Sequence, residues 1–225
     1  MANQTPNTRL CAGSLILIPA LITLAITILR LVGELQHWSK AWFNPEAGGP
    51  WSIVGITWLA AIFGIYFAIR LLRGGEGPAS SWRAIGVALL GGVVMFPGQI
   101  IGRKFIFPYS FKATLIFLCA AWALAGLLQS AAWPSLFKVL LAYGYAARVP
   151  VAFVMFLAFR GQWGTHYDAL PPGWHSEGLW GDFVWLGFFP QLTFWVGFTI
   201  AAGSLFGALG AATARLFKRS PEASA

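Results

Sequence analysis

Six long apolar stretches run through this chain of 225 residues. A helix needs about 20 apolar residues to cross the hydrocarbon core of a bilayer, and each stretch has about that length or more. Their apolarity is continuous, whereas the strands of a membrane barrel alternate apolar and polar residues. The sequence therefore predicts an all-α integral membrane protein, a bundle of about six transmembrane helices with short loops. The expected spans cover residues 13–36, 51–72, 82–102, 111–129, 135–159 and 179–214.

The composition favours the same class of protein. Charged residues make up only 10% of the chain and hydrophobic residues 58%, whereas a soluble domain carries about 25% charged residues. Most side chains must therefore face lipid or other helices. The net charge of +8 comes from Lys and Arg residues that flank the spans, where they meet anionic lipid headgroups. They form no basic stripe with interleaved aromatic residues, so we expect the lipid bilayer, and no nucleic acid, as a partner.

The spans leave room for one transmembrane domain over residues 1–225, which we expect to end in a basic disordered tail at residues 215–225. Six spans would place both termini on one side of the membrane. Eight of the 15 Lys and Arg residues fall on that side and six on the other, with Arg148 left inside a span. Cytoplasmic segments carry the excess of basic residues, so this bias predicts cytoplasmic termini. We expect the inner (plasma) membrane of a bacterium.

Arg148 lies near the middle of the fifth span, in the run AYGYAARVPVAF. A charged side chain at the bilayer centre costs about 2.5–3.5 kcal/mol on insertion scales, so it normally faces the bundle interior or a cavity. The alternative is a shifted span from which the side chain reaches the headgroups. No Asp or Glu lies well inside another span, and Glu34 is expected to pair with Arg30, four residues before it. An inward Arg148 would therefore need amides, carbonyls, water or an anionic ligand as its partner.

Gln99 and Gln191 each follow a proline within an apolar span, in the sequences FPGQ and FPQ. A proline frees a backbone carbonyl, and a neighbouring carboxamide can then line a polar path together with Arg148. The alternative interpretation is that each glutamine bridges two helices by hydrogen bonds. The similarity between these two short sequences is also typical of transporters with inverted repeats, although a chance match explains it more simply.

Two Trp-rich loops, residues 37–50 and 160–180, fall on the predicted outer side. The second contains His166 with Asp168 and His175 with Glu177, and His37 falls on the same side. Imidazole and carboxylate groups ligate divalent metals and serve as acids and bases. Their spacing matches no metal motif, so we assign no metal, catalytic residue or cofactor and keep these five as candidates. Polar side chains that cap turns at the membrane surface are the simpler interpretation.

Small residues recur every four positions in two spans, at Gly98 and Gly102 and at Gly203, Gly207 and Ala211. Such ladders let helix backbones approach closely, either within a bundle or between protomers. We therefore expect these residues to pack helices rather than to carry chemistry.

Three functions remain open after these observations. The scarcity of polar residues in the spans favours a non-enzymatic accessory or scaffold subunit, which docks on other membrane proteins or on copies of itself. The second hypothesis is a small carrier or channel for an anionic or amphiphilic solute centred on Arg148. The third is a membrane enzyme that uses the His and acid residues of the 160–180 loop. No nucleophile elbow, phosphate-binding loop or dinucleotide motif supports an enzyme.

Overall fold

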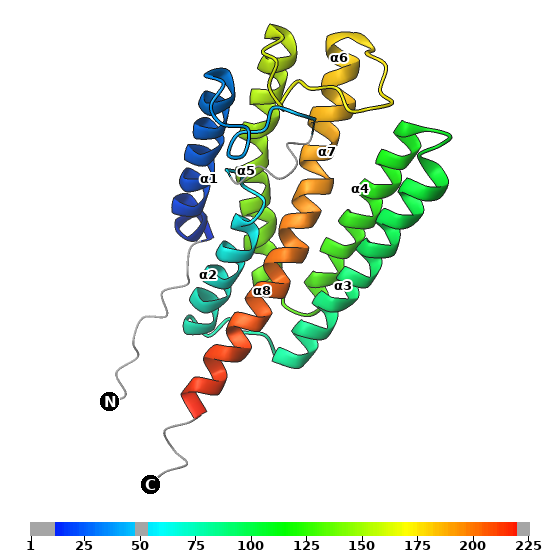
Figure 1. The fold of residues 1–225 in the computed structure, drawn as a ribbon. Coiled ribbons are helices and arrows are strands. Elements are labelled where there is room, and N and C mark those ends of the chain that lie inside the picture. Colours follow the sequence, from blue (N-terminus) through cyan, green and yellow to red (C-terminus); the bar gives the residue numbers. More distant parts are fainter. Residues whose placement is uncertain (1–11, 48–53, 220–225) are drawn as a thin grey trace.

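The structure is a computed structural model that describes residues 12–47 and 54–219, and these residues form helices and loops with no strand. This confirms the predicted all-α bundle (Figure 1). The helices are α1 (Ala12–Leu35), α2 (Leu59–Arg73), α3 (Ser81–Ile101), α4 (Phe111–Leu128), α5 (Pro134–Gly161), α6 (Gly178–Asp182), α7 (Phe189–Leu192) and α8 (Phe194–Arg219). Wider π-helical turns join α3 to the α3–α4 loop (η1, Gly102–Ile106) and α6 to α7 (η3, Phe183–Phe188), and a 3-10 turn (η2, Gln129–Ala131) follows α4.

Five helical segments of the described chain are long and apolar enough to cross a membrane. They are Gly13–Leu35, Ser81–Ile106, Phe111–Ala131, Pro134–Gly161 and Gly178–Phe217. Large apolar side chains on these segments are exposed, among them Ile18, Val93 and Phe153. A soluble protein would bury such residues, so the exposed apolar surface is the surface that meets lipid. The chain is therefore an integral membrane protein.

The segment expected as the second span, residues 51–72, is shorter in the structure. Residues 51–53 lie outside the described part, and α2 begins only at Leu59 and has 15 residues. At 1.5 Å per residue it is about 22 Å long, less than the roughly 30 Å of a hydrocarbon core. Residues 54–58 precede it without regular structure, and they include the β-branched Val54, Ile56 and Thr57, which are poor helix formers.

The expectation of a disordered tail over residues 215–225 is wrong for its first part. Helix α8 continues to Arg219, and residues 220–225 lie outside the described chain. Between Ala211 and Arg219 there is no Gly or Pro to end the helix, and basic residues are favourable at a helix C-terminus. Arg215 also holds this end, because its guanidinium donates to Ser81 Oγ and to the Pro78 carbonyl, both over 2.9 Å.

The helices alternate in direction, so the start of α1 and the end of α8 lie at one end of the bundle (Figure 1). We call this the terminal end and the other the loop end, where residues 36–47 and 162–177 connect the helices. Helix α2 occupies only the half of the bundle near the terminal end. The broken last span descends from the loop end as α6, η3, α7 and α8.

Small residues allow close helix packing at two crossings, α2 with α8 and α3 with α4. Helix α8 crosses α2 where Gly203 and Gly207 face Gly64, and a methyl group added at Gly207 would come within 2.8 Å of the Gly64 carbonyl oxygen. Ala211, next on the ladder, is fully buried. In α3, a methyl group at Gly98 would touch Ala121 of α4 at 3.3 Å. Gly102, at the start of η1, faces Leu118 of α4 in the same way.

The apolar core of the terminal half is continuous across four helices. Its largest fully buried members are Leu15 of α1, Phe67 of α2, and Leu136, Leu140 and Tyr143 of α5, and Val196 and Ile200 of α8 belong to the same cluster. The Tyr143 hydroxyl is satisfied by Thr23 Oγ1 of α1 at 2.8 Å. On α5, the core residues Leu136 to Ala147 all precede Arg148, so this core lies on the terminal side of that residue.

Candidate functional site

A cavity of about 370 Å³ lies in the loop half of the bundle, above the apolar core. Helices α1, α3, α4, α5, α7 and α8, the turns η1 and η3, the 162–177 loop and the irregular segment before α2 all contribute to its wall. Its apolar surface comes mainly from Phe111, Leu115, Leu118, Val151, Met155, Trp185, Leu186, Phe194 and Trp195. Irregular backbone is tolerated at membrane depth where it lines a cavity, and Ile56 and Thr57 before α2 do so here.

The polar surface of the cavity is cationic. Arg30, Arg103 and Arg148 line it together with His166, and no Asp or Glu of the described residues does. Arg103 is exposed and forms part of the rim, whereas Arg148 is 5% exposed. The charge of Arg30 is compensated by Glu34, whereas Arg103 and Arg148 produce a positive potential in this partly apolar cavity, because its low-dielectric wall screens them less than water would. The arrangement therefore favours an anion.

Arg148 is buried in the bundle interior and does not reach the membrane surface. Its Nη1 donates to Gln191 Oε1 over 3.4 Å, and its guanidinium carbon lies 4.7 Å from the centre of the Trp195 ring. Its Nε has no hydrogen-bond partner among the described residues. Buried polar atoms are nearly always paired, and a buried charge without a counter-ion is costly. Among the described residues, the contacts of this buried guanidinium are thus one neutral amide and one aromatic ring.

Gln99 and Gln191 lie in the wall of the same cavity, so the structure brings both glutamines and Arg148 together. The Gln191 amide also donates to Met155 Sδ over 3.4 Å, which fixes its oxygen toward Arg148. The two π-helical turns lie beside this region. A π-helical turn widens a helix and is frequent at functional sites, and η3 carries Trp185 and Leu186 into the cavity wall.

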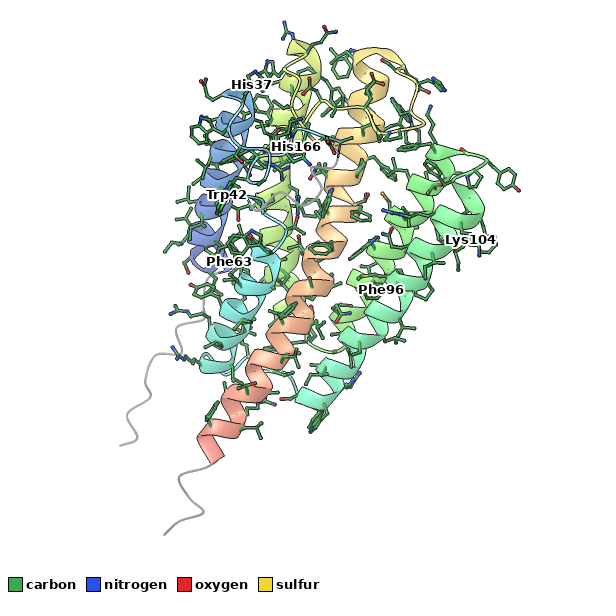
Figure 2. The ribbon with its side chains drawn as sticks, viewed as in Figure 1. His37, Trp42, Phe63, Phe96, Lys104 and His166 are labelled. Carbon is green, nitrogen blue, oxygen red and sulfur yellow. The ribbon has the colours of Figure 1, made fainter. Side chains whose placement is uncertain are left out.

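His166 is held by Glu34 of α1, and not by an acid of its own loop. Its Nδ1 lies 2.7 Å from Glu34 Oε1, and its backbone N–H donates to Oε2 over 2.9 Å. The predicted ion pair between Arg30 and Glu34 is confirmed, with Arg30 Nε 2.8 Å from the carboxylate. The Glu34 side chain is fully buried, and Arg30 compensates its charge while His166 hydrogen-bonds to it. Figure 2 shows His166 within the loop half of the bundle and His37, which is exposed, at the end of α1.

The protonation of His166 follows from these partners. Burial lowers the pKa of the imidazole below its ordinary value of 6.5, and the hydrogen bond to Glu34 opposes this effect only in part. His166 is thus neutral at pH 7. A carboxylate paired with arginine can only accept hydrogen bonds, so Nδ1 must carry the proton of the neutral ring. Nε2 is then an unprotonated acceptor, and no described residue bonds to it.

The other polar candidates of the loops do not join the cavity. Asp168 accepts from Thr165 Oγ1 and from the backbone of Gly164 and Thr165, so it holds the turn of its own loop. Glu177 pairs with Lys112 of α4 at 2.7 Å. His175 and His37 are exposed. In the described chain, no three His, Cys, Asp or Glu side chains are placed to hold a metal.

A second set of contacts joins the 162–177 loop to the helices at the loop end of the bundle. Asp182 is buried and accepts from Trp174 Nε1, Ser176 Oγ and the Glu177 backbone. The Trp174 ring in turn packs edge-on against Phe111, with ring centres 5.3 Å apart. These bonds hold residues 174–177 next to the start of α4. Phe111, which Trp174 contacts, lines the cavity.

Sequence reasoning missed several members of this site. Arg103 is indistinguishable in the sequence from the basic residues that set topology, and Arg30 is explained there by Glu34 alone. Trp195 has the same sequence environment as other aromatic residues of the spans. Only the spacing of Arg30 and Glu34 gave a signal, and it predicted a local pair without the third partner, His166.

Comparisons with known proteins add no relative: no family model, no curated protein and no solved structure matches this chain. The fold and the site nevertheless define a class. The chain is an integral membrane protein, a helical bundle that contains a cationic, partly apolar cavity in one half of its depth.

Proposed function

We propose that this protein is a carrier that binds a small organic anion with an apolar part in the cavity, with Arg148 as the anchor of the anionic group. The observation that carries the proposal is that Arg148, a buried residue of the cavity wall, has no carboxylate partner among the described residues and an Nε without a hydrogen bond. The ligand supplies the missing negative charge. The apolar part packs on Trp195 and the neighbouring aromatic side chains.

The size of the cavity supports a small ligand. Sites for small molecules have volumes of roughly 300–1,000 Å³, and about 370 Å³ is near the lower limit. A lipid with two acyl chains does not fit such a volume. A short-chain or aromatic acid does. Its charge can be a carboxylate, sulfonate or phosphate, because a guanidinium binds each of these oxyanions by charge-assisted hydrogen bonds.

The distribution of basic residues supports one orientation of the protein in the membrane. It favours a cytoplasmic terminal end in a bacterial inner membrane, and the cavity then opens toward the outer side together with the two Trp-rich loops. The packed core below Arg148 argues against an open channel, since it blocks the passage to the terminal end. A carrier must open this core to release its ligand. The scaffold hypothesis, which the composition favoured, has no comparable observation in its support.

The proposal is tested by the thermal stability of the purified protein in neutral maltoside micelles. The probe is 1-octanesulfonate, and octyltrimethylammonium and octyl glucoside share its chain with a positive or a neutral headgroup. A ligand that binds only the folded state raises its stability by mass action. We expect a concentration-dependent rise of Tm with the sulfonate alone. Equal effects of all three amphiphiles, or none, would overturn the proposal.

A further inference from the structure

His166 is the cavity-lining side chain of the described chain whose charge can change near neutral pH. The other titratable groups of the wall are Arg30, Arg103, Arg148 and Tyr167. Arginine stays protonated at any physiological pH, and a tyrosine ordinarily ionises near pH 10. Burial raises the pKa of Tyr167 further. A change in the charge of this cavity near neutrality must therefore occur on His166.

The charges around His166 decide when it accepts a proton. Glu34 of α1 faces its Nδ1 and favours the protonated ring, and so does Asp168 of its own loop. Arg30 of α1 opposes protonation. Tyr167, the adjacent ring at 3.9 Å between centres, is neutral. Arg148 of α5 and Arg103 of η1 share the cavity and add positive charge.

A bound anion shifts the protonation equilibrium of His166 toward the protonated ring. Its negative charge cancels part of the field of the arginines and attracts a positive charge on the imidazole. The ring has a free position for the proton, because Nδ1–H is already donated to Glu34 while Nε2 is unprotonated. Once protonated, Nε2–H becomes a hydrogen-bond donor on a residue that lines the cavity. By reciprocity, an anion that favours protonation of His166 is itself bound more tightly when His166 is protonated.

Resting on the proposed function, we propose that the cavity takes up its anion together with one proton, and that Nε2 of His166 holds this proton. For a ligand with a single negative charge, the pair of ligand and proton is neutral. The loaded carrier then has the same net charge as the empty one. A carrier of this kind couples the movement of an organic acid anion to that of a proton.

The test measures proton uptake on binding directly. Purified protein in weakly buffered maltoside solution is titrated with 1-octanesulfonate, which keeps its single charge throughout the neutral range, while an indicator dye reports the pH. We expect wild-type protein to take up as much as one proton per bound anion. Its Kd should fall as the pH falls, by at most tenfold per pH unit for a single coupled proton.

The variant His166→Gln removes the titrating group and keeps a polar side chain, and its backbone bond to Glu34 is retained. We expect it to bind the sulfonate with no proton uptake and with a Kd that does not depend on pH. His175→Gln, an exposed histidine outside the cavity, is the matched control and should behave as wild type.

The outcomes separate this inference from the proposed function. Wild-type protein that binds the anion without taking up a proton would overturn the inference and leave the proposed function standing. Equal proton uptake by His166→Gln would overturn the assignment to His166. Absence of sulfonate binding to wild-type protein would overturn both. The wild-type titration alone decides the matter should the variant fail to fold.

Discussion

The guanidinium of Arg148 reaches Gln191 Oε1 over 3.4 Å, and this long bond to a neutral amide is its one hydrogen bond to the described side chains. Gln191 precedes α8 by three residues, and Trp195, which Arg148 also contacts, lies in the first turn of that helix. The buried guanidinium of α5 thus contacts the interrupted part of the last span, where α7 ends and α8 begins. This contact joins the two helices that bound the centre of the cavity.

A buried charge that serves a ligand should be costly to the empty protein. Even a buried ion pair can often be replaced by apolar side chains of similar volume with a neutral or stabilising effect of about 1–4 kcal/mol, because charges are costly to bury, and Arg148 has no ion-pair partner among the described residues. We therefore expect Arg148→Met to leave the stability of the ligand-free protein unchanged or to raise it, as measured by thermal unfolding in maltoside. A loss comparable to that of the core variant Leu140→Ala, about 2–5 kcal/mol, would show that Arg148 has a structural role.

The pH dependence of stability should report on His166. Its pKa is lowered in the folded protein, so between that lowered value and the ordinary 6.5 the unfolded chain binds a proton that the folded one does not. The stabilisation from the neutral ring is full above pH 6.5 and is lost as the pH falls below it. Unfolding curves at a series of pH values should show this loss in wild-type protein. It should be reduced in His166→Gln and retained in His175→Gln.

The crossing of α2 and α8 leaves no space for side chains at its centre. A methyl group at Gly64 would overlap the backbone of Gly203, whereas one at Gly92 of α3 meets no atom within 4 Å. We expect Gly64→Ala to lower the free energy of unfolding by about 1–3 kcal/mol, as overpacking does. Gly92→Ala, the matched control, should raise it by about 0.5–1 kcal/mol through helix propensity. Equal effects would contradict the packing described.

The ion pair of Lys112 and Glu177 connects the start of α4 to the loop beside the cavity. Both side chains are partly exposed, so removal of the pair should change stability by less than about 1 kcal/mol. Lys112 also lies 5.1 Å from the centre of the Trp185 ring in the cavity wall. We expect Glu177→Gln to speed the release of 1-octanesulfonate in stopped-flow measurements, because it loosens this side of the wall. Unchanged release rates would show that ligands leave elsewhere.

Much of the fold followed from the sequence, because apolar length alone decides which segments cross a bilayer. The length of α2 did not follow from the sequence. The segment before α2 is apolar yet poor in helix-forming residues, and hydropathy does not distinguish an apolar helix from an apolar irregular segment. At the site, the prolines and glutamines of two spans indicated a polar path. The contact between His166 and Glu34 joins a loop to a helix 132 residues away, and no local pattern encodes such a distance.

The central claim is that Arg148 anchors an anion, and the Kd of 1-octanesulfonate tests it most directly. Loss of a charge-assisted hydrogen-bonding group costs about 1.5–3 kcal/mol, which weakens binding by about 10- to 100-fold. Isothermal titration should show this loss for Arg148→Met and none for Arg70→Met, which removes an exposed arginine of α2 outside the cavity. If both variants bind the sulfonate as tightly as wild-type protein, Arg148 is not the anchor.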